Sequence, residues 1–221
     1  MENPFVKKPR ITCTRTSPLR VEDLKKFATV TGKPLPVKPV MLLCRCGASK
    51  KKPFCDGSHR HTGFSGDKKP GRKTDRPVEY KGREITIVDN HGVCSHNQAC
   101  FKNLPAVFQP EKFKWIKPDN ASKEEIIETI KKCPSGALSY KIDGIRYQNL
   151  DREPAIYVDP EGPFEVVGGI LFEDDTGSRP EAEEHYTLCR CGRSKNMPFC
   201  DGTHLPGIFA RDQEREKKKG K

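Results

Sequence analysis

One 16-residue pattern occurs twice in the sequence, and this repeat constrains the fold more than any other feature. The first copy runs from Cys44 to His59 and the second from Cys189 to His204, at an offset of 145 residues without a gap. Twelve of the 16 positions are identical. Each copy presents three thiols and one imidazole, in the order C-x-C, eight residues, C-x3-H. The sequence therefore contains the donor set of a metal site twice.

The composition indicates that such sites are needed for stability. Only 33% of the 221 residues are apolar, and the chain has 18 glycines and 19 prolines. A chain this polar buries little apolar surface per module, so each module needs a further source of stability. Neither a signal peptide nor a stretch of roughly 18–20 apolar residues, as a membrane helix requires, is recognisable. We therefore expect a cytoplasmic chain without a membrane span, in which the ten cysteines are reduced and bind metal rather than form disulfides.

The spacing of the donors favours a two-iron cluster. Thiolates select zinc, copper(I) or iron–sulfur clusters. In a [2Fe–2S] unit, one iron would bind Cys44 and Cys46, and the other would bind Cys55 and His59. Structural zinc is the alternative, although it more often uses ligand pairs separated by two to four residues. The corresponding second set is Cys189, Cys191, Cys200 and His204.

The remaining sequence predicts short elements joined by irregular segments. Apolar and β-branched runs predict strands at 40–43, 78–90, 137–142, 164–172 and 185–188. A capping box at Ser122 and Glu125 predicts a helix that ends before Pro134. We expect an extended arm at 1–20, a short helical turn at 21–28, a linker at 60–76 and an irregular connection at 143–163. The expected fold class is α+β, with domains at 1–76, 77–142 and 143–221.

Both motifs resemble the signature of the CDGSH iron–sulfur family, which is C-x-C, two residues, Ser or Thr, three residues, Pro, one residue, C-D-G, Ser/Thr/Ala, His. Every position matches in both copies. In that family, three cysteines and one histidine hold a redox-active [2Fe–2S] cluster, and members act as homodimers or as single chains with two motifs. The resemblance implies two small β-rich modules, two [2Fe–2S] clusters and an internal pseudo-dimer. Because imidazole titrates near neutral pH, we expect reduction to be accompanied by proton uptake at His59 and His204.

A third set of cysteines, Cys94, Cys100 and Cys133, lies between the two motifs. Proline after the last of them is typical of bacterial ferredoxin loops. Three buried structural cysteines are the alternative, since a free buried cysteine is common. From about residue 78 to 140 the chain resembles the divergent single-cluster ferredoxins, including those that feed haem monooxygenases. The residues that carry the resemblance are the three cysteines, Phe108, Trp115, the late helix and the segment 133–138.

This central segment departs from an ordinary [4Fe–4S] ferredoxin at one position. The pattern C-x2-C-x2-C would place its middle cysteine where this chain has Asn97. Three thiolates can hold a [3Fe–4S] cluster, or a [4Fe–4S] cluster whose fourth iron takes water or another ligand. The neighbouring His96 is a candidate for that extra ligand. We therefore expect a ferredoxin-like α+β module with one [3Fe–4S] or [4Fe–4S] cluster.

The expected function is electron transfer through three clusters. No nucleophile–base pair, phosphate loop or nucleotide fingerprint is recognisable, so we expect no catalysis by this chain alone. The alternatives are a carrier that transfers clusters to other proteins, a redox or pH sensor, and a structural zinc protein. Cys13 has no second donor near it in sequence and is expected not to be a ligand. His61, His91 and His185 are expected to be ordinary surface residues.

The formal net charge of +11 bears on the choice of partner. Much of it lies at Lys50–Lys52, inside the first motif, and at Arg215–Lys221. These clusters are either a solvated basic surface or a docking patch for an acidic redox partner, since opposite charge speeds encounter. Nucleic acid is disfavoured because the few aromatic residues are not interleaved with the basic clusters. The sequence does not fix the oligomeric state.

Overall fold

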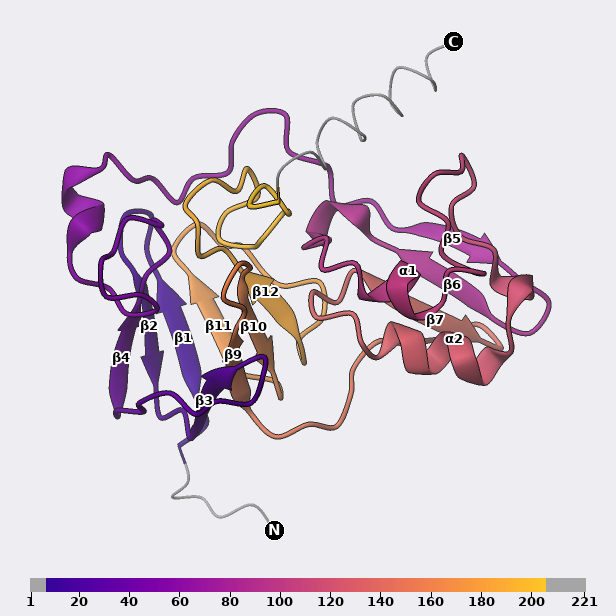
Figure 1. Ribbon diagram of the computed structural model, residues 1–221, viewed down its shortest axis with the longest axis horizontal. Helices are drawn as coiled ribbons and strands as arrows, with labels where there is room; N and C mark the ends of the chain where they lie inside the picture. Colours follow the sequence, from indigo (N-terminus) through magenta and orange to yellow (C-terminus); the bar gives the residue numbers. More distant parts are fainter. Residues whose placement is uncertain (1–6, 206–221) are drawn as a thin grey trace.

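Strands from the two outer segments of the chain come together in one lobe, and the middle segment forms a second lobe beside it (Figure 1). The computed structural model describes residues 7–205. The basic cluster Arg215–Lys221 and the first residues of the predicted N-terminal arm lie outside this range. No helix among the described residues is long and apolar enough to cross a membrane.

The first lobe is built from a structural repeat. The first half supplies β1 (Arg10–Cys13), β2 (Leu19–Glu22), β3 (Lys26–Thr29) and β4 (Val40–Leu43). The second half supplies β9 (Ala155–Val158), β10 (Phe164–Val167), β11 (Leu171–Asp174) and β12 (Tyr186–Leu188). Corresponding strands of the two halves are separated by 145 residues in sequence. The one exception is that β12 starts one residue later than β4 would predict. The repeat seen in the two motifs therefore extends over the whole of each half.

The two halves exchange their third strands. One four-stranded sheet has the order β11-β1-β2-β4 and the other has the order β12-β10-β9-β3. The exchanged strands pair in parallel, with Ile11 opposite Phe172 and Phe27 opposite Ile156. Gly168 and Gly169, both at positive φ, turn the chain from β10 in one sheet to β11 in the other, a conformation that glycine adopts without steric penalty. Each half thus needs a strand of the other half to complete its sheet.

One hydrophobic core contains side chains from both sheets. In β4, Met41 and Leu43 are buried whereas Val40 and Leu42 are exposed, as expected of a strand with one face on the core. Cys13 belongs to this core, and burial raises the pKa of its thiol to about 12. The burial of apolar groups from both halves stabilises the strand exchange. Further buried members are Leu19, Val21, Leu24, Phe27, Ile156, Val158, Phe164, Val166, Ile170, Tyr186, Leu188 and Phe199.

Three predictions for the outer segments are wrong. The described part of the predicted arm contains β1 and the start of β2, the predicted helical turn at 21–28 contains parts of β2 and β3, and the predicted irregular connection at 143–163 contains β9 and the short β8 (Ile145–Tyr147). The apolar side chains that suggested a helix, such as Leu24 and Phe27, are buried in the core as strand and turn residues. Asp23, at a φ of 57°, separates β2 from β3. Pairing of β1 with β11 and of β3 with β9, strands that are distant in sequence, overrode the local pattern.

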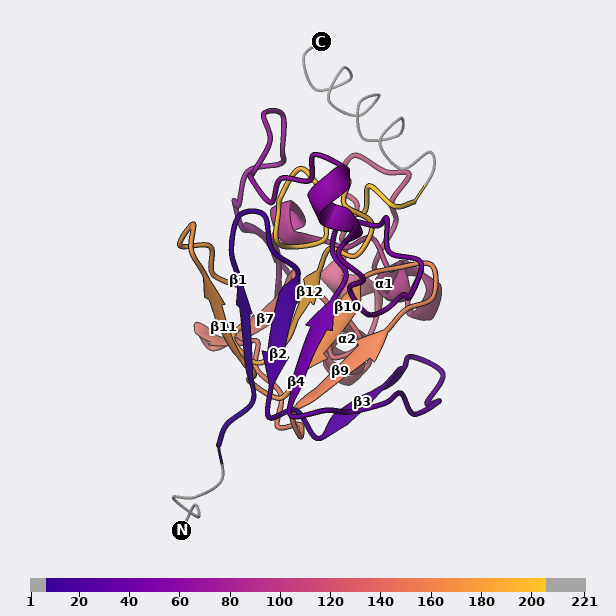
Figure 2. The same cartoon turned by 90° about the vertical axis from the view of Figure 1, so that its left-hand side faces the viewer.

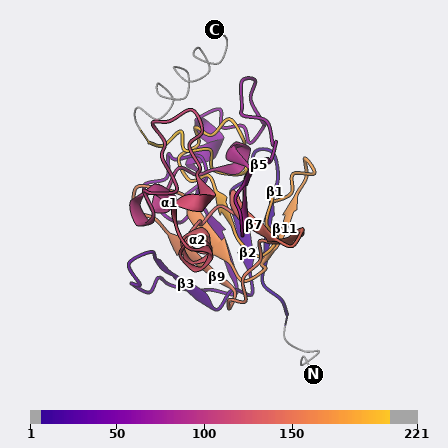
Figure 3. The ribbon, with the colours of Figure 1, turned by 90° about the vertical axis from the view of Figure 1, so that its right-hand side faces the viewer.

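The second lobe is an antiparallel sheet covered by two helices (Figure 3). The strand order is β5-β6-β7-β8, with β5 at Val78–Lys81, β6 at Thr86–Asp89 and β7 at Leu138–Ile142. The helices are α1 (Ala99–Asn103) and α2 (Lys123–Ile130), and the capping box predicted for α2 is confirmed. Short 3₁₀ turns occur at η1 (Ser58–His61), η2 (His91–Val93) and η3 (Pro118–Asn120). The strands predicted at 40–43, 137–142 and 185–188 are confirmed to within one residue.

Candidate iron–sulfur sites

Each CDGSH motif is a loop that folds back onto the strand before it. Cys44 follows β4 directly, and its amide donates to the carbonyl of Pro53 at 2.8 Å. The amide of Cys55 donates to the carbonyl of Leu42, also at 2.8 Å. These two bonds bring the third cysteine beside the first. The matching bonds of the second motif run from Cys189 to Pro198 at 2.8 Å and from Cys200 to Thr187 at 3.0 Å.

The four donors of each motif lie in pairs. In the first motif, the Sγ atoms of Cys44 and Cys46 are 3.7 Å apart, and Cys55 Sγ is 3.4 Å from His59 Nδ1. Two ligands bound at about 2.3 Å to a tetrahedral metal are separated by about 3.8 Å. Each pair therefore fits one metal, and two pairs per motif fit the two irons of a [2Fe–2S] cluster. The pairs of the second motif are Cys189 with Cys191 at 3.8 Å and Cys200 with His204 Nδ1 at 3.4 Å.

Polar side chains that recur in both copies of the repeat fix the shape of the loop. The Asp56 carboxylate accepts from the Ser58 hydroxyl at 2.6 Å and from the amides of Lys50 and Ser58 at 2.8 and 3.0 Å. The hydrogen bond from the Ser58 hydroxyl is the largest cause that holds the pKa of Asp56 well below its usual range, and the two amide bonds act in the same direction. The Ser49 hydroxyl donates to the carbonyl of Phe54 at 2.7 Å. Asp201, Thr203 and Ser194 make the same bonds in the second motif.

The arginine between the first two cysteines has a structural role that the sequence reasoning missed. Arg45 is 1% exposed, and its guanidinium donates to the carbonyls of Thr14 and Ser17 in the turn between β1 and β2. Arg190 donates to the backbone carbonyls of Asp159 and Gly162, which lie 145 positions after Thr14 and Ser17. Each arginine thus ties its C-x-C segment to a turn of the same half. The identity of this position in the two copies was the signal available in the sequence.

The two motifs contact each other at their second cysteines. Cys46 and Cys191 form an isolated antiparallel bridge. The glycines that follow them make this approach possible, because a Cβ on Gly47 would overlap the carbonyl of Cys191 and a Cβ on Gly192 would overlap the carbonyl of Cys46. Both glycines have positive φ, 78° and 75°. The two candidate [2Fe–2S] sites are therefore direct neighbours.

The thiol of Cys191 is the most acidic of the second motif. Its hydrogen bond with Cys189 lowers the pKa of Cys191 to about 5, and contacts with Arg193 act in the same direction. The pKa of Cys189 is raised by that bond and by burial, and burial raises the pKa of Cys200. Thiolates are the form that binds metal, so the cationic Arg193 beside Cys191 favours metal binding here.

The three central cysteines converge beneath the two helices. Cys94 follows η2, Cys100 lies on α1 and Cys133 follows α2, and all three contact the core of the second lobe. Burial raises the pKa of Cys100 to about 12 and holds that of Cys94 well above its usual value, and the proximity of Cys133 adds to both shifts. Like charges that shift each other's pKa lie close together. An iron–sulfur cluster, whose positive irons bind thiolates, would remove this repulsion.

The loop from Cys94 to Cys100 offers further groups to a bound cluster. The amide of His96 donates to Cys94 Sγ at 3.4 Å. The hydroxyl of Ser95 is buried and has no hydrogen-bond partner among the described residues. Hydrogen bonds to cluster sulfurs are a recurrent feature of iron–sulfur sites. The donor set and the unsatisfied hydroxyl thus fit a cluster held by the three cysteines.

The same loop lies against the second CDGSH motif. A Cβ on Gly202 would overlap the imidazole ring of His96. Asn97, which stands where an ordinary ferredoxin has its middle cysteine, has its amide 3.5 Å from the carboxylate of Glu165 in β10. The Asn196 side chain donates to the carbonyl of Gly92 at 3.2 Å. The loop that contains this departure from an ordinary ferredoxin therefore faces β10 and the second motif, whose loop (yellow in Figure 1) lies beside the second lobe.

The prediction that His185 is a surface residue is wrong. Its side chain is 2% exposed, and its Nδ1 atom lies 2.8 Å from the carboxylate of Glu184, which Arg152 also contacts at 2.7 Å. His91 is only partly exposed, and its ring lies 5.0 Å from that of His96. Gly136 of the second lobe lies against this segment, where an added Cβ would be 3.0 Å from the carbonyl oxygen of His185, and no local sequence pattern indicates that contact.

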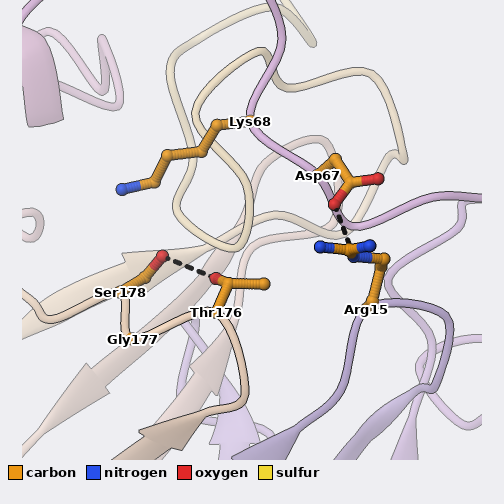
Figure 4. A pocket seen from close by; sticks show the side chains of 6 residues that line it. All are labelled: Arg15, Asp67, Lys68, Thr176, Gly177 and Ser178. Atoms are coloured by element: carbon orange, nitrogen blue, oxygen red, sulfur yellow. Dashed lines mark hydrogen bonds and ion pairs between the residues drawn. The ribbon is translucent and has the colours of Figure 1, made fainter.

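A polar depression of about 450 Å³ lies elsewhere on the first lobe (Figure 4). It is lined by Arg15, Asp67, Lys68, Thr176, Gly177 and Ser178. Arg15 is paired with Asp67 at 2.8 Å, and the hydroxyls of Thr176 and Ser178 are 3.1 Å apart. No cysteine or histidine lines it, so it is separate from the candidate metal sites.

Comparisons with known proteins agree with this geometry. The family described as "Iron-binding zinc finger CDGSH type" matches residues 16–60 and 161–205, and the family described as "Divergent 4Fe-4S mono-cluster" matches residues 80–143. The "Uncharacterized protein YjdI" of Escherichia coli, in strains K12 and O157:H7, is 32% identical over 62 residues, which are 28% of this chain and 82% of the relative. No solved structure matches the chain.

The domains define an iron–sulfur-binding protein with a strand-rich α+β fold, as the sequence predicted. The chain carries two domains of the CDGSH iron-binding family, with a domain of the divergent 4Fe-4S mono-cluster family between them.

Proposed function

We propose that this protein transfers electrons through two [2Fe–2S] clusters and one [3Fe–4S] or [4Fe–4S] cluster. The observation that carries the proposal is that the three candidate sites lie in series. The central loop packs against the second motif through His96 and Gly202, and the second motif pairs with the first through Cys191 and Cys46. Adjacent redox sites within one chain are what electron transfer requires.

The proposed ligands follow from the donor geometry. Cys44, Cys46, Cys55 and His59 hold the first [2Fe–2S] cluster. Cys94, Cys100 and Cys133 hold the central cluster, with His96 as the candidate for an extra ligand. When bound, each cluster supplies a site that takes up and releases an electron. The ligands of the second [2Fe–2S] cluster are Cys189, Cys191, Cys200 and His204.

The protein residues position these sites and separate them from water. Arg45 and Arg190 fix the two C-x-C segments, and Gly47 and Gly192 let the motifs approach each other. Cys133 is buried in the second lobe, and Cys94 and Cys100 are half-buried against the same core, which limits the access of water to the central site. None of the ten cysteines forms a disulfide, which supports a reducing compartment such as the cytoplasm.

The proposal is tested by counting iron, zinc and acid-labile sulfide per chain on protein purified without oxygen, together with its visible and electron paramagnetic resonance spectra. About seven or eight irons, with a [3Fe–4S] or [4Fe–4S] signal beside [2Fe–2S] signals, is the expected result. About four irons would remove the central cluster from the proposal. Zinc without sulfide would overturn the proposal in favour of the structural zinc protein.

Cluster transfer to other proteins is a second candidate function. The observation in its favour is the exposure of the first motif, where Lys50, Lys51, Lys52 and Asp56 are exposed while the equivalent residues of the second motif are buried or half-buried. A carrier mixed with an apo-ferredoxin would lose iron at the same rate at which the visible spectrum of the holo-ferredoxin appears. An electron-transfer protein would keep its iron under the same conditions.

A further inference from the structure

The two halves of the first lobe repeat each other, but only one of them is covered by the second lobe. In the second half, His185, Thr187, Asn196 and Met197 are each at most 2% exposed. The residues 145 positions earlier are Val40, Leu42, Lys51 and Lys52, and all four are exposed, Val40 by 42% and Leu42 by 46%. The same structural face is therefore buried in one half and exposed in the other.

Contacts with the middle segment of the chain account for the burial in the second half. Asn196, the counterpart of Lys51, donates to the carbonyl of Gly92. A Cβ on Gly136 would lie 3.0 Å from the carbonyl oxygen of His185, the counterpart of Val40. The ring of His96 lies against Gly202. At the counterpart of Gly202, which is Gly57, no described residue comes within 4 Å of a Cβ.

We propose that the exposed face of the first half, formed by Val40, Leu42 and Lys50–Lys52, is the docking face for an acidic one-electron redox protein. We call it the β4 face. It lies on the side of the first lobe that Figure 2 turns toward the viewer, with β4 at the edge of its sheet. The partner occupies on the first motif the position that the ferredoxin-like module occupies on the second. This inference rests on the proposed electron transfer.

The chemistry of the β4 face selects the partner. An apolar pair, Val40 and Leu42, lies on a strand that leads directly into a loop with three consecutive lysines. Interfaces of transient redox complexes combine a small apolar centre with charges that steer encounter. A second copy of this chain is disfavoured as the occupant, because each copy carries a formal net charge of +11. A protein with an acidic surface has the complementary charge.

Docking at the β4 face would bring a partner to the first cluster. Cys55 and His59 are only half-buried, and Cys44 directly follows β4. With a cluster held by Cys44, Cys46, Cys55 and His59, the first motif would accept one electron from the reduced partner. The partner would be oxidised by one electron, the motif's cluster would be reduced by one electron, and no bond would be made or broken in either protein. The three sites in series can then pass the electron on toward the central site.

The test is stopped-flow mixing of the oxidised holoprotein with a reduced, acidic plant-type [2Fe–2S] ferredoxin, followed by visible absorbance. Lys51→Glu with Lys52→Glu should lower the second-order rate constant about tenfold at low salt, and the difference should shrink at high salt. The matched control, Lys112→Glu with Lys114→Glu, reverses two exposed charges of the second lobe and should change the rate less than about twofold. Leu42→Ser should weaken binding at all salt concentrations.

Reduction by dithionite tests the proposed electron transfer separately from the proposed docking, since this small reductant needs no docking face. If dithionite reduces the clusters of every variant at the wild-type rate, but the two lysine pairs slow the ferredoxin reaction equally, the β4 face is not the docking site. A wild-type protein that dithionite reduces and ferredoxin does not would overturn the docking proposal as well. Clusters that dithionite cannot reduce would overturn the proposed electron transfer itself.

Discussion

At the scale of single residues, Gly47 and Gly192 decide how closely the two cluster sites approach. Both have positive φ, and a side chain on either would overlap a backbone carbonyl of the other motif. Backbone atoms cannot move aside as a flexible side chain can, so the two motifs would have to separate. The contact therefore depends on the absence of a side chain at these positions.

Gly47→Ala should destabilise the holoprotein by about 3 kcal/mol, of which about 1 kcal/mol reflects the left-handed backbone and the rest the overlap with Cys191. Gly32→Ala is the matched control, because Gly32 has a φ of 86° and no described residue within 4 Å of its Cβ position. It should lose only about 1 kcal/mol. Thermal unfolding followed by loss of visible absorbance measures both. Equal losses would mean that the contact between motifs does not limit stability.

Cys133→Ala should remove the central cluster and leave the two [2Fe–2S] clusters in place. The proposed ligands of the central cluster belong to the second lobe, whereas those of the [2Fe–2S] clusters belong to the first lobe. Iron should fall by about three or four atoms per chain, and the [3Fe–4S] or [4Fe–4S] signal should disappear. Cys13→Ala is the control, since it removes a buried thiol that lies in the core of the first lobe. Iron analysis with electron paramagnetic resonance decides. An unchanged iron content in Cys133→Ala would contradict the proposed ligand set.

Glu165, which lies at the contact between the lobes, should make stability depend on pH. Burial raises its pKa to about 7 from a usual value near 4.5. The folded protein therefore holds this proton more tightly than the unfolded chain, and stability falls as pH rises through about 7. Glu165→Gln should remove this loss, so that it stabilises the protein by about 1 kcal/mol more at pH 8.5 than at pH 6. Melting temperatures of both proteins at the two pH values test this, and a gain independent of pH would refute it.

The candidate ligands could be identified from the sequence, whereas their supporting contacts could not. Three thiols and a histidine at fixed spacing specify their own chemistry, so Cys44 and His59 were identifiable without coordinates. Arg45 donates hydrogen bonds to the carbonyls of Thr14 and Ser17, and no local sequence pattern links residues so far apart. The sequence indicates His96, next to Asn97, as a candidate extra ligand, but its contact with Gly202 depends on how the lobes pack.

At the scale of elements, the exchange of β3 and β11 is the feature that makes the two halves one folding unit. Each exchanged strand pairs in parallel with a strand of the other half. Parallel partners distant in sequence leave no hairpin turn to recognise, which is why the N-terminal segment was predicted as an arm and a helical turn. The strands β4 and β12 were predicted correctly because each is a short apolar run directly before a cysteine motif.

The helix α2 of the second lobe provides a test confined to one element. Ser122 accepts from the Glu125 amide at 3.3 Å, and the Glu125 carboxylate accepts from the Ser122 amide at 2.9 Å. Ser122→Ala should destabilise the second lobe by about 1 kcal/mol. Glu125→Gln, which preserves the capping box, should lose less. Hydrogen exchange of α2 amides measures the difference, and equal exchange in both variants would show that the cap does not limit this lobe.

At the scale of the whole molecule, the arrangement is asymmetric although the first lobe is built from a repeat. The ferredoxin-like module covers the second motif and leaves the β4 face of the first motif exposed (Figures 1 and 2). The three candidate sites thus form a series with the three central cysteines at one end and the first motif at the other. This order would give an external partner one accessible motif, and the proposed electron transfer depends on it.

Repeated cycles of reduction and reoxidation, followed by electron paramagnetic resonance on anaerobically purified protein, test this account most directly. Electron transfer through sites in series predicts signals from two [2Fe–2S] clusters and one central cluster, with splitting between the neighbouring reduced clusters and a constant iron content from cycle to cycle. Iron that is lost at each reduction would contradict electron transfer and support cluster transfer. Clusters that cycle without any magnetic interaction would contradict the arrangement of the sites in series.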